Sequence, residues 1–156
     1  MKRHNDFEQQ VMSVIESYGN VQLTYDKESV VSTEILKQSN DKNKLFTDAG
    51  SPYYTKIGNQ KRTEFVYYSP INSVDIRVEC KSRKKSGLLG EILYELNFVL
   101  KIPEKKYCMV FSDTLIDKYF LKQLKITIKE KNLTEKVWFG SLKNFERFLK
   151  KNLTQM

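Results

Sequence analysis

Residues 74–81 read Val-Asp-Ile-Arg-Val-Glu-Cys-Lys, and the basic run Ser-Arg-Lys-Lys follows at residues 82–85. Apolar and charged residues alternate through the first eight positions, which is the period of a half-buried strand. One face of this strand is expected to lie in the core. The other face carries two carboxylates and two cations, and charged residues are poor strand formers that stay at the surface unless they are paired or used. The pattern predicts a strand of a sheet that also carries a functional site.

Glu79 and Lys81 point to the same face of this strand and lie roughly 6.6 Å apart along it. A carboxylate is a hard oxygen ligand for Mg²⁺, and an ammonium at this spacing stabilises charge on phosphoryl oxygens or orients an attacking water. The same two residues also fit an ordinary exposed ion pair, worth about 0 to 1 kcal/mol. The preceding segment favours the site over the ion pair.

Residues 63–68, Thr-Glu-Phe-Val-Tyr-Tyr, predict a second strand, and Ser-Pro-Ile-Asn-Ser at 69–73 predicts a turn. A turn centred between the third and fourth residues of that run gives an antiparallel hairpin in which Glu64 faces Glu79, about 5 Å away. Like charges that face each other across strands destabilise a sheet unless a cation lies between them. The hairpin therefore predicts a metal site, whereas a slip of one residue would put an apolar neighbour of Glu79 opposite Glu64.

Three short motifs carry a family resemblance. Residues 61–65 read Lys-Arg-Thr-Glu-Phe, residues 76–81 read Ile-Arg-Val-Glu-Cys-Lys, and Ser-Gly follows at 86–87. Together they resemble the PD-(D/E)XK nuclease superfamily, whose members include restriction endonucleases and Holliday-junction resolvases. The order of predicted elements from roughly residue 5 to residue 150 also fits this resemblance.

The resemblance implies roles for the hairpin residues. Glu64 would be the first acid, Glu79 the second acid and Lys81 the lysine, with the backbone carbonyl of Cys80 as a further metal ligand. The family usually has Asp where this chain has Glu64, which is one methylene longer. Asp75 is an alternative first acid, but four residues along one strand place it about 13 Å from Glu79.

Other residues gain accessory roles by the same resemblance. Glu8 in the first helix and Glu91 in the helix after the hairpin are candidates for contact with the metal site, and a solvated surface residue is the alternative for each. Contacts to phosphates outside the reacting centre would position the nucleic-acid backbone without recognising the base sequence. The candidates for these contacts are Lys61, Arg62, Arg83, Lys84 and Lys85.

The function implied is Mg²⁺-dependent hydrolysis of phosphodiester bonds, most simply in DNA, with Mn²⁺ as a possible substitute and RNA left open as a substrate. A competing class is a non-catalytic nucleic-acid-binding module on the same fold, which Glu64 in place of Asp favours. A third interpretation stacks single-stranded bases on Phe65, Tyr67 and Tyr68. It is weaker, because adjacent strand residues point to opposite faces and such aromatics usually belong to the core.

Composition is consistent with these expectations. The 156 residues are 40% hydrophobic, which fits one domain over residues 1–156, and a net charge of +8 fits a polyanionic partner. Lysine-rich composition also simply keeps proteins soluble. Cys80 and Cys108 lie in apolar strand patterns and form no metal motif with the lone His4, which indicates a reducing compartment. Neither a signal peptide nor a membrane-spanning run is evident, so a cytoplasmic protein is expected, with a homodimer left open.

The sequence predicts an α/β fold with a restriction-endonuclease-like mixed central sheet, a catalytic β-hairpin and helices on both faces. Before the hairpin, we expect a helix from Asn5 or Asp6 to Gly19, a short helix over 28–37, a mobile loop over 39–44, and a strand from 53 to 57 with a turn at 58–59. After the hairpin, we expect a helix over 88–100 whose inward residues are Leu89, Ile92, Leu93, Leu96 and Leu100, followed by a strand over 106–111. The last elements expected are a helix over 115–131 capped by Ser112 or Asp113, a strand over 136–140, and a final helix whose inward residues are Leu142, Phe145, Phe148 and Leu149.

Overall fold

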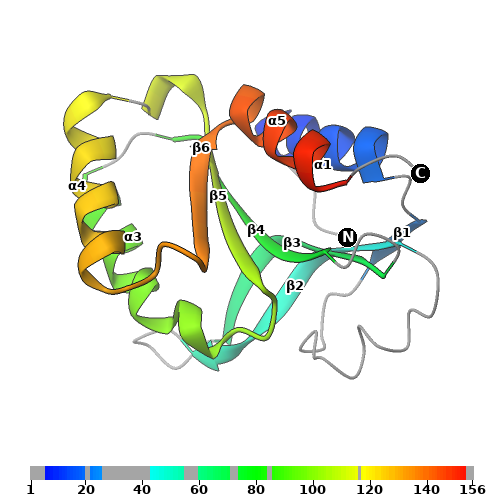
Figure 1. Cartoon of the computed structure of the whole chain (residues 1–156), viewed down its shortest axis with the longest axis horizontal. Helices are drawn as coiled ribbons and strands as arrows, with labels where there is room; N and C mark the ends of the chain where they lie inside the picture. Colours follow the sequence, from blue (N-terminus) through cyan, green and yellow to red (C-terminus); the bar gives the residue numbers. More distant parts are fainter. Residues whose placement is uncertain are drawn as a thin grey trace.

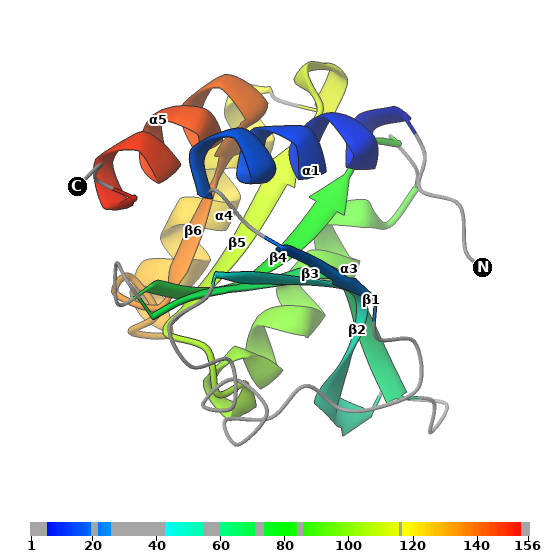
Figure 2. The same cartoon turned by 90° about the vertical axis from the view of Figure 1, so that its right-hand side faces the viewer.

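The computed structural model describes residues 6–19, 22–25, 43–54, 60–70, 74–83, 86–115 and 117–153. These residues form an α/β fold in which helices cover both faces of one sheet (Figure 1, Figure 2). The strands described are β1 (Gln22–Tyr25), β2 (Lys44–Tyr54), β3 (Gln60–Ser69), β4 (Val74–Lys81), β5 (Lys106–Phe111) and β6 (Val137–Ser141). The helices are α1 (Asp6–Gly19), α3 (Leu88–Glu95), α4 (Lys118–Glu130) and α5 (Leu142–Asn152), with 3₁₀ turns η1 (Leu96–Lys101) and η2 (Asp113–Leu115).

The strands lie in the sheet in chain order, from β1 to β6. β2, β3 and β4 form an antiparallel meander, whereas β1 pairs parallel with β2. β5 and β6 continue the sheet in parallel with β4. Parallel neighbours need a crossover connection, and α3 and α4 supply it between β4 and β5 and between β5 and β6. The predicted mixed sheet is therefore confirmed.

Each face of the sheet has its own core. One core lies under α1 and α5 and includes Val11 and Ile15 of α1 with Phe145 and Leu149 of α5. The other lies under α3 and α4 and includes Ile92 and Leu124. Both views show α1 and α5 next to each other on one face of the sheet, with α3 and α4 on the other (Figure 1, Figure 2).

Alternate side chains of β4 point to opposite faces of the sheet and so toward different cores. Its apolar residues belong to the core under α1 and α5, as the alternation predicted. Its charged residues therefore point toward α3 and α4. This second face is also buried, because Arg77 is 0% exposed and Glu79 only 3%. A sheet with helices on both faces leaves no solvated side for a central strand, so the charges on β4 lie inside the protein.

Several predicted elements are confirmed. The first helix ends at Gly19, the strand over 106–111 has the predicted bounds, and the last helix buries Phe145 and Leu149 with Leu142 and Phe148 packed against them. The strand expected over 136–140 runs from Val137 to Ser141. These segments have strong local periodicity and clear ends.

The helix predicted over 88–100 is wrong in its second half. The α-helix stops at Glu95, and the chain continues as the 3₁₀ turn η1. With about three residues per turn, residues at every third position face the core, and Leu96, Val99 and Ile102 are buried. Leu100, expected inward, is 71% exposed as a result.

The start of α4 also differs from the prediction. Residues 113–115 form the separate turn η2, and α4 begins at Lys118. Asp117, not Ser112 or Asp113, is its N-cap, because its carboxylate accepts a hydrogen bond of 2.8 Å from the Phe120 N–H. Several polar residues precede this helix, and the sequence alone did not single out the one that caps it.

The segment before the hairpin was misjudged. A loop was expected as far as Lys44 and a strand only from Tyr53, whereas β2 runs from Lys44 to Tyr54 and pairs with β3. β1 was not predicted. The helix predicted over 28–37, the loop residues 39–42 and residues 55–59 lie outside the described part of the chain. Of the helices that the structure describes, none is both long enough and apolar enough to cross a bilayer.

Candidate active site

The β3–β4 hairpin brings two glutamates together. Its register runs from Ser69 opposite Val74 to Phe65 opposite Val78, so Glu64 and Glu79 are the next residues on each strand. This is the predicted register. The Glu64 carboxylate reaches β4, where its Oε2 accepts a hydrogen bond of 2.9 Å from the backbone N–H of Cys80.

The pKa of Glu64 is shifted by its burial and by its neighbours. Burial raises this pKa well above its ordinary value, and the charge of Glu79 and a hydrogen bond with Glu79 raise it further. The N–H of Cys80 acts in the opposite direction, because it stabilises the charged carboxylate. Two buried carboxylates this close retain a proton unless a cation neutralises them.

A third carboxylate, that of Glu8, lies near the Cys80 thiol. Burial raises the pKa of the Cys80 thiol well above its ordinary value, and the charges of Glu64, Glu79 and Glu8 add to the shift in that order. Glu8 belongs to α1 and is 9% exposed, so the alternative of a solvated surface residue is wrong for it. Helix α1 therefore brings Glu8 close to the end of β4.

Lys81 lies beside these carboxylates and is held by α3. Its Nζ is 3.3 Å from Oε1 of Glu95 and 3.7 Å from Oε1 of Glu91. The other oxygen of Glu95 accepts a hydrogen bond of 3.2 Å from the hydroxyl of Tyr107 on β5. Glu91 thus contacts the site through Lys81. The side chains of Lys81 and Glu95 are only 10% and 8% exposed, so this ion pair is largely buried.

Sequence reasoning missed Glu95 and Tyr107. Glu95 lies one turn after Glu91 in a helix that was interpreted as largely apolar, and a buried glutamate there required a cation in reach. Tyr107 is the second residue of a strand interpreted as apolar core. The spacing of Glu91 and Glu95, four residues on one helical face, was the available signal.

The donor atoms at the end of the hairpin fit a small divalent cation. Among the residues that the structure describes, no three His, Cys, Asp or Glu side chains are grouped so that they could hold a metal ion. Mg²⁺, however, commonly takes one or two carboxylates and completes its shell with water and substrate oxygens. Glu64, Glu79 and the carbonyl of Cys80 supply a donor set of this kind. We call Glu64, Glu79 and Lys81 the carboxylate cluster.

The other predicted residues are distributed unevenly. Asp75 pairs with Tyr68 in the hairpin and has Lys105 and Lys136 as its charged neighbours, so it does not join Glu64. Arg83 is exposed just beyond β4. Lys61 and Arg62 belong to β3, but their side chains are outside the described part of the structure. Lys84 and Lys85 lie outside it entirely.

Base stacking on the hairpin aromatics is excluded for two of the three residues. Phe65 and Tyr67 are both 0% exposed and belong to the core under α1 and α5. A nucleic-acid base has no access to their rings. Tyr68 is partly exposed, but one ring does not make a stacking platform.

A second group of buried charges lies on the same face of β4. Arg77 donates from Nε to Oε1 of Glu104 at 2.6 Å and from Nη1 to the hydroxyl of Thr63 at 3.0 Å. The side chains of Arg77 and Glu104 are both 0% exposed. Lys136 donates to the backbone carbonyls of Ile102 and Glu104 and fixes the loop that carries Glu104. We call Arg77, Glu104 and Thr63 the arginine cluster.

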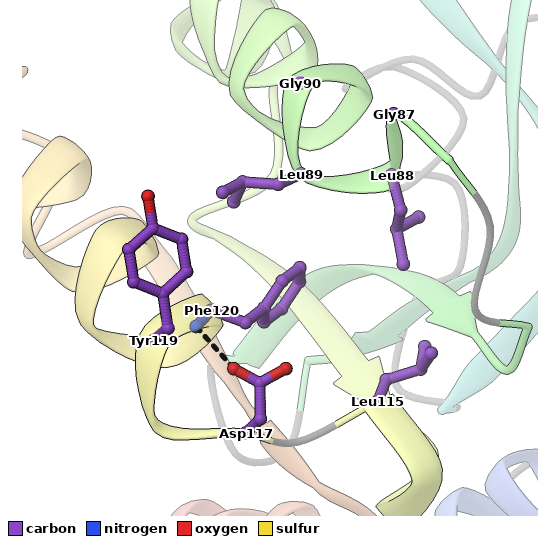
Figure 3. Close-up of a pocket in the computed structure, with 8 residues that line it drawn as sticks. All are labelled: Gly87, Leu88, Leu89, Gly90, Leu115, Asp117, Tyr119 and Phe120. Atoms are coloured by element: carbon purple, nitrogen blue, oxygen red, sulfur yellow. Dashed lines mark hydrogen bonds between the residues drawn. The ribbon is translucent and has the colours of Figure 1, made fainter.

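A cavity of about 270 Å³ opens between the first turns of α3 and α4 (Figure 3). Its walls are mainly apolar, and Leu89 and Tyr119 point toward each other across it. Asp117 is the charged residue among those described that line it, and one of its oxygens caps α4. Because no cation lines this cavity within the described residues, it is not suited to holding a phosphate.

Comparison of the chain with family models, with curated proteins and with solved structures gave no match.

Proposed function

We propose that this protein is a divalent-metal-dependent nuclease that hydrolyses phosphodiester bonds, most simply those of DNA. The observation that carries the proposal is the approach of the partly buried Glu64 carboxylate to the buried Glu79, on the strand face that also carries Lys81. Such a pair is unfavourable in a protein that only needs to fold, because it costs stability at neutral pH. It becomes favourable when a cation binds.

The finer fold assignment belongs to the same proposal. We infer that the domain is restriction-endonuclease-like and related to the PD-(D/E)XK nucleases. A helix, an antiparallel meander of three strands, a crossover helix and a parallel strand occur here in the order α1, β2–β4, α3 and β5, which supports the assignment. Glu64 in place of the usual Asp is the departure from that family.

Each residue then has a role that its position supports. Glu64, Glu79 and the Cys80 carbonyl would hold Mg²⁺ or Mn²⁺, and a bound divalent ion lowers the pKa of its water and offsets charge on the phosphate. Lys81 would stabilise charge on the phosphoryl oxygens. Glu95 and Glu91 hold the Lys81 ammonium near the carboxylates, and Tyr107 orients Glu95 by its hydrogen bond. Burial keeps the pair out of bulk water, where its charges would be screened.

Substrate binding outside the reacting centre is assigned to cations near the hairpin. Arg83 is exposed directly after β4 and fits a contact to a flanking phosphate. Lys84 and Lys85 follow it in the chain, and Lys61 and Arg62 precede Glu64, so they are proposed for the same purpose. Contacts of this kind are independent of base sequence and depend strongly on salt.

The test is cleavage of supercoiled, linear and branched DNA with Mg²⁺ or Mn²⁺ by the wild type and by Glu79→Gln. The amide is nearly isosteric with the carboxylate but carries no charge for the metal, so we expect cleavage to be abolished. Glu16→Gln is the matched control, because Glu16 is an exposed glutamate on α1. Full activity of Glu79→Gln would refute the assignment.

A second readout does not depend on turnover. Mg²⁺ that binds the folded state at one hundred times its Kd stabilises it by about 2.7 kcal/mol. We therefore expect Mg²⁺ to raise the melting temperature of the wild type and of Glu16→Gln, but not that of Glu79→Gln. Equal shifts in all three proteins would place the metal elsewhere.

One observation favours a second candidate, a nucleic-acid-binding module without turnover. The Lys81 ammonium is already engaged by Glu91 and Glu95, and Glu79 is only 3% exposed, so a substrate phosphate must displace existing contacts to reach them. A wild type that binds DNA with a clear salt dependence and cuts none of its forms with either metal would establish this candidate.

A further inference from the structure

The outer edge of the sheet carries a basic and aromatic groove away from the carboxylate cluster. β6 pairs with β5 and is the last strand in the sheet order of the described residues. An open groove of about 550 Å³ lies along it and under the second half of α5. Its lining includes three cations and three aromatic residues, namely Lys106, Arg147, Lys151, Trp138, Phe139 and Phe148, of which Phe139 packs its side chain on the opposite face of the sheet. We call it the β6–α5 groove.

The charge of this groove has one sign. No Asp or Glu is among the described residues that line it. α5 adds to this charge, because it carries Lys143, Arg147, Lys150 and Lys151 against the single acid Glu146. Arg147 and Lys151 are exposed and lie one turn apart on the helix. A ligand of this groove is therefore an anion that can meet several cations spaced along one wall.

The aromatic wall is fixed in position. The indole of Trp138 packs at 5.3 Å from the ring of Phe148 and at 5.5 Å from that of Phe145. Gly140 makes room for it, because a Cβ there would lie 3.1 Å from the indole. Trp138 and Phe148 are partly rather than fully buried. Rings held in this way present a surface on which a planar group can stack with little loss of side-chain entropy.

The geometry points to an unpaired stretch of nucleic acid as the ligand of this groove, with a base on Trp138 and Phe148 and phosphates on Arg147, Lys151 and Lys106. Proteins bind single strands by combining a positively charged groove with aromatic rings, because every base has a face that stacks. A membrane surface fits less well, since the exposed large apolar residues described are Leu100, Tyr119 and Ile126, and none lines the groove.

The groove is separate from the carboxylate cluster. Lys106 pairs with Ile76 in the sheet, whereas Lys81 pairs with Phe111, so Lys106 and Lys81 lie roughly 16 Å apart along the strands. β6 is a further strand away from β4. Binding here involves none of the residues assigned to hydrolysis and is expected in a protein that does not cut. A nuclease with this second surface would act on substrates in which an unpaired segment lies near the bond that is cut.

Trp138 makes the test direct, because it is the only tryptophan in the chain. We would titrate the protein in EDTA with a single-stranded oligothymidylate, with a duplex of equal length and with free thymidine monophosphate, and record tryptophan fluorescence together with the anisotropy of labelled DNA. Saturable quenching by the single strand at a lower concentration than by the duplex or the mononucleotide is expected. Binding seen by anisotropy without any change in tryptophan fluorescence would overturn the proposal.

Matched pairs of substitutions separate the groove from general electrostatics. Arg147→Ala with Lys151→Ala removes two cations from the groove, and Lys143→Ala with Lys150→Ala removes two exposed cations of the same helix outside it. We expect the first pair to weaken single-strand binding about tenfold or more. It should also flatten the dependence of log affinity on log salt by about 0.7 for each phosphate that the groove no longer neutralises. Equal losses of affinity for both pairs would refute a specific site.

Phe148→Leu tests the stacking wall while keeping an apolar side chain. We expect weaker quenching and a several-fold loss of single-strand affinity, with duplex binding unchanged. Glu79→Gln should bind the single strand like the wild type, so the proposed hydrolysis and the proposed binding surface can fail independently. Unchanged single-strand affinity in Phe148→Leu would remove base stacking from the proposal.

Discussion

The arginine cluster and the carboxylate cluster lie on the same face of β4, and they meet the cost of buried charge in opposite ways. In the arginine cluster, a fully buried cation meets a fully buried anion at 2.6 Å, and Thr63 receives a further hydrogen bond. In the carboxylate cluster, the partly buried Glu64 approaches the buried Glu79, and the pKa of Glu64 is raised. In the first arrangement, the two opposite charges offset each other within the protein. The second would be stabilised by the cation that we propose it binds, which would make the first pair structural and the second functional.

Arg77→Met should have the largest effect on stability. It leaves the Glu104 carboxylate buried without its cation, and breaking a buried ion pair in this way costs about 3 to 5 kcal/mol. Urea denaturation of the purified variant measures this loss. Arg77→Met combined with Glu104→Met should recover most of it, because apolar residues of similar volume replace both charges. A double variant as unstable as the single one would mean that the pair does not act as a unit.

Lys81→Ala should act mainly on the reaction. Loss of one electrostatic stabiliser lowers a rate by a factor of order 100 or more, so single-turnover cleavage at saturating DNA should fall by that factor. DNA affinity should stay within a few fold of the wild type. Arg83→Ala is the control, because it should weaken binding and flatten its salt dependence while cleavage at saturation is kept. Wild-type cleavage by Lys81→Ala would remove this lysine from the mechanism.

The carboxylate cluster should make the metal-free protein more stable at mildly acidic pH. The folded-state pKa of Glu64 lies above its ordinary value, so the folded protein binds more protons than the unfolded chain. The destabilisation is present above the raised pKa and disappears as the pH falls through it. Denaturation in EDTA between about pH 8 and about pH 5 should therefore show the stability of the wild type rising relative to that of Glu64→Gln. Saturating Mg²⁺ should reduce this difference, and parallel pH profiles without metal would contradict the shared burial of the pair.

Tyr107→Phe should have the smallest effect. It removes one hydrogen bond to Glu95, worth about 1 kcal/mol, and keeps the ring in the core. If Tyr107 positions Lys81 through Glu95, the cleavage rate should fall several-fold with no change in DNA affinity. A loss of stability without any loss of rate would limit Tyr107 to a structural role.

Local sequence pattern predicted the parts of this protein whose cause is local. The alternation of residues 74–81 gave β4 and its two faces, and the composition of residues 69–73 gave a hairpin whose register brings Glu64 to Glu79. Regular apolar spacing gave α1 and α5 for the same reason. In each of these segments, hydrophobic period and end signals agree, so few alternatives compete with the observed structure.

Tertiary structure decided which of the charges are buried and what they meet. Glu104 reaches Arg77 across 27 residues of chain, and Glu95 of α3, which accepts a hydrogen bond from Tyr107 of β5, holds Lys81. The β6–α5 groove likewise joins the start of β5 to a strand and a helix much later in the chain. No local pattern encodes such partners. Charge and hydrophobic period can be seen within one segment of the sequence, whereas the burial of a side chain and its neighbours depend on how the segments pack together.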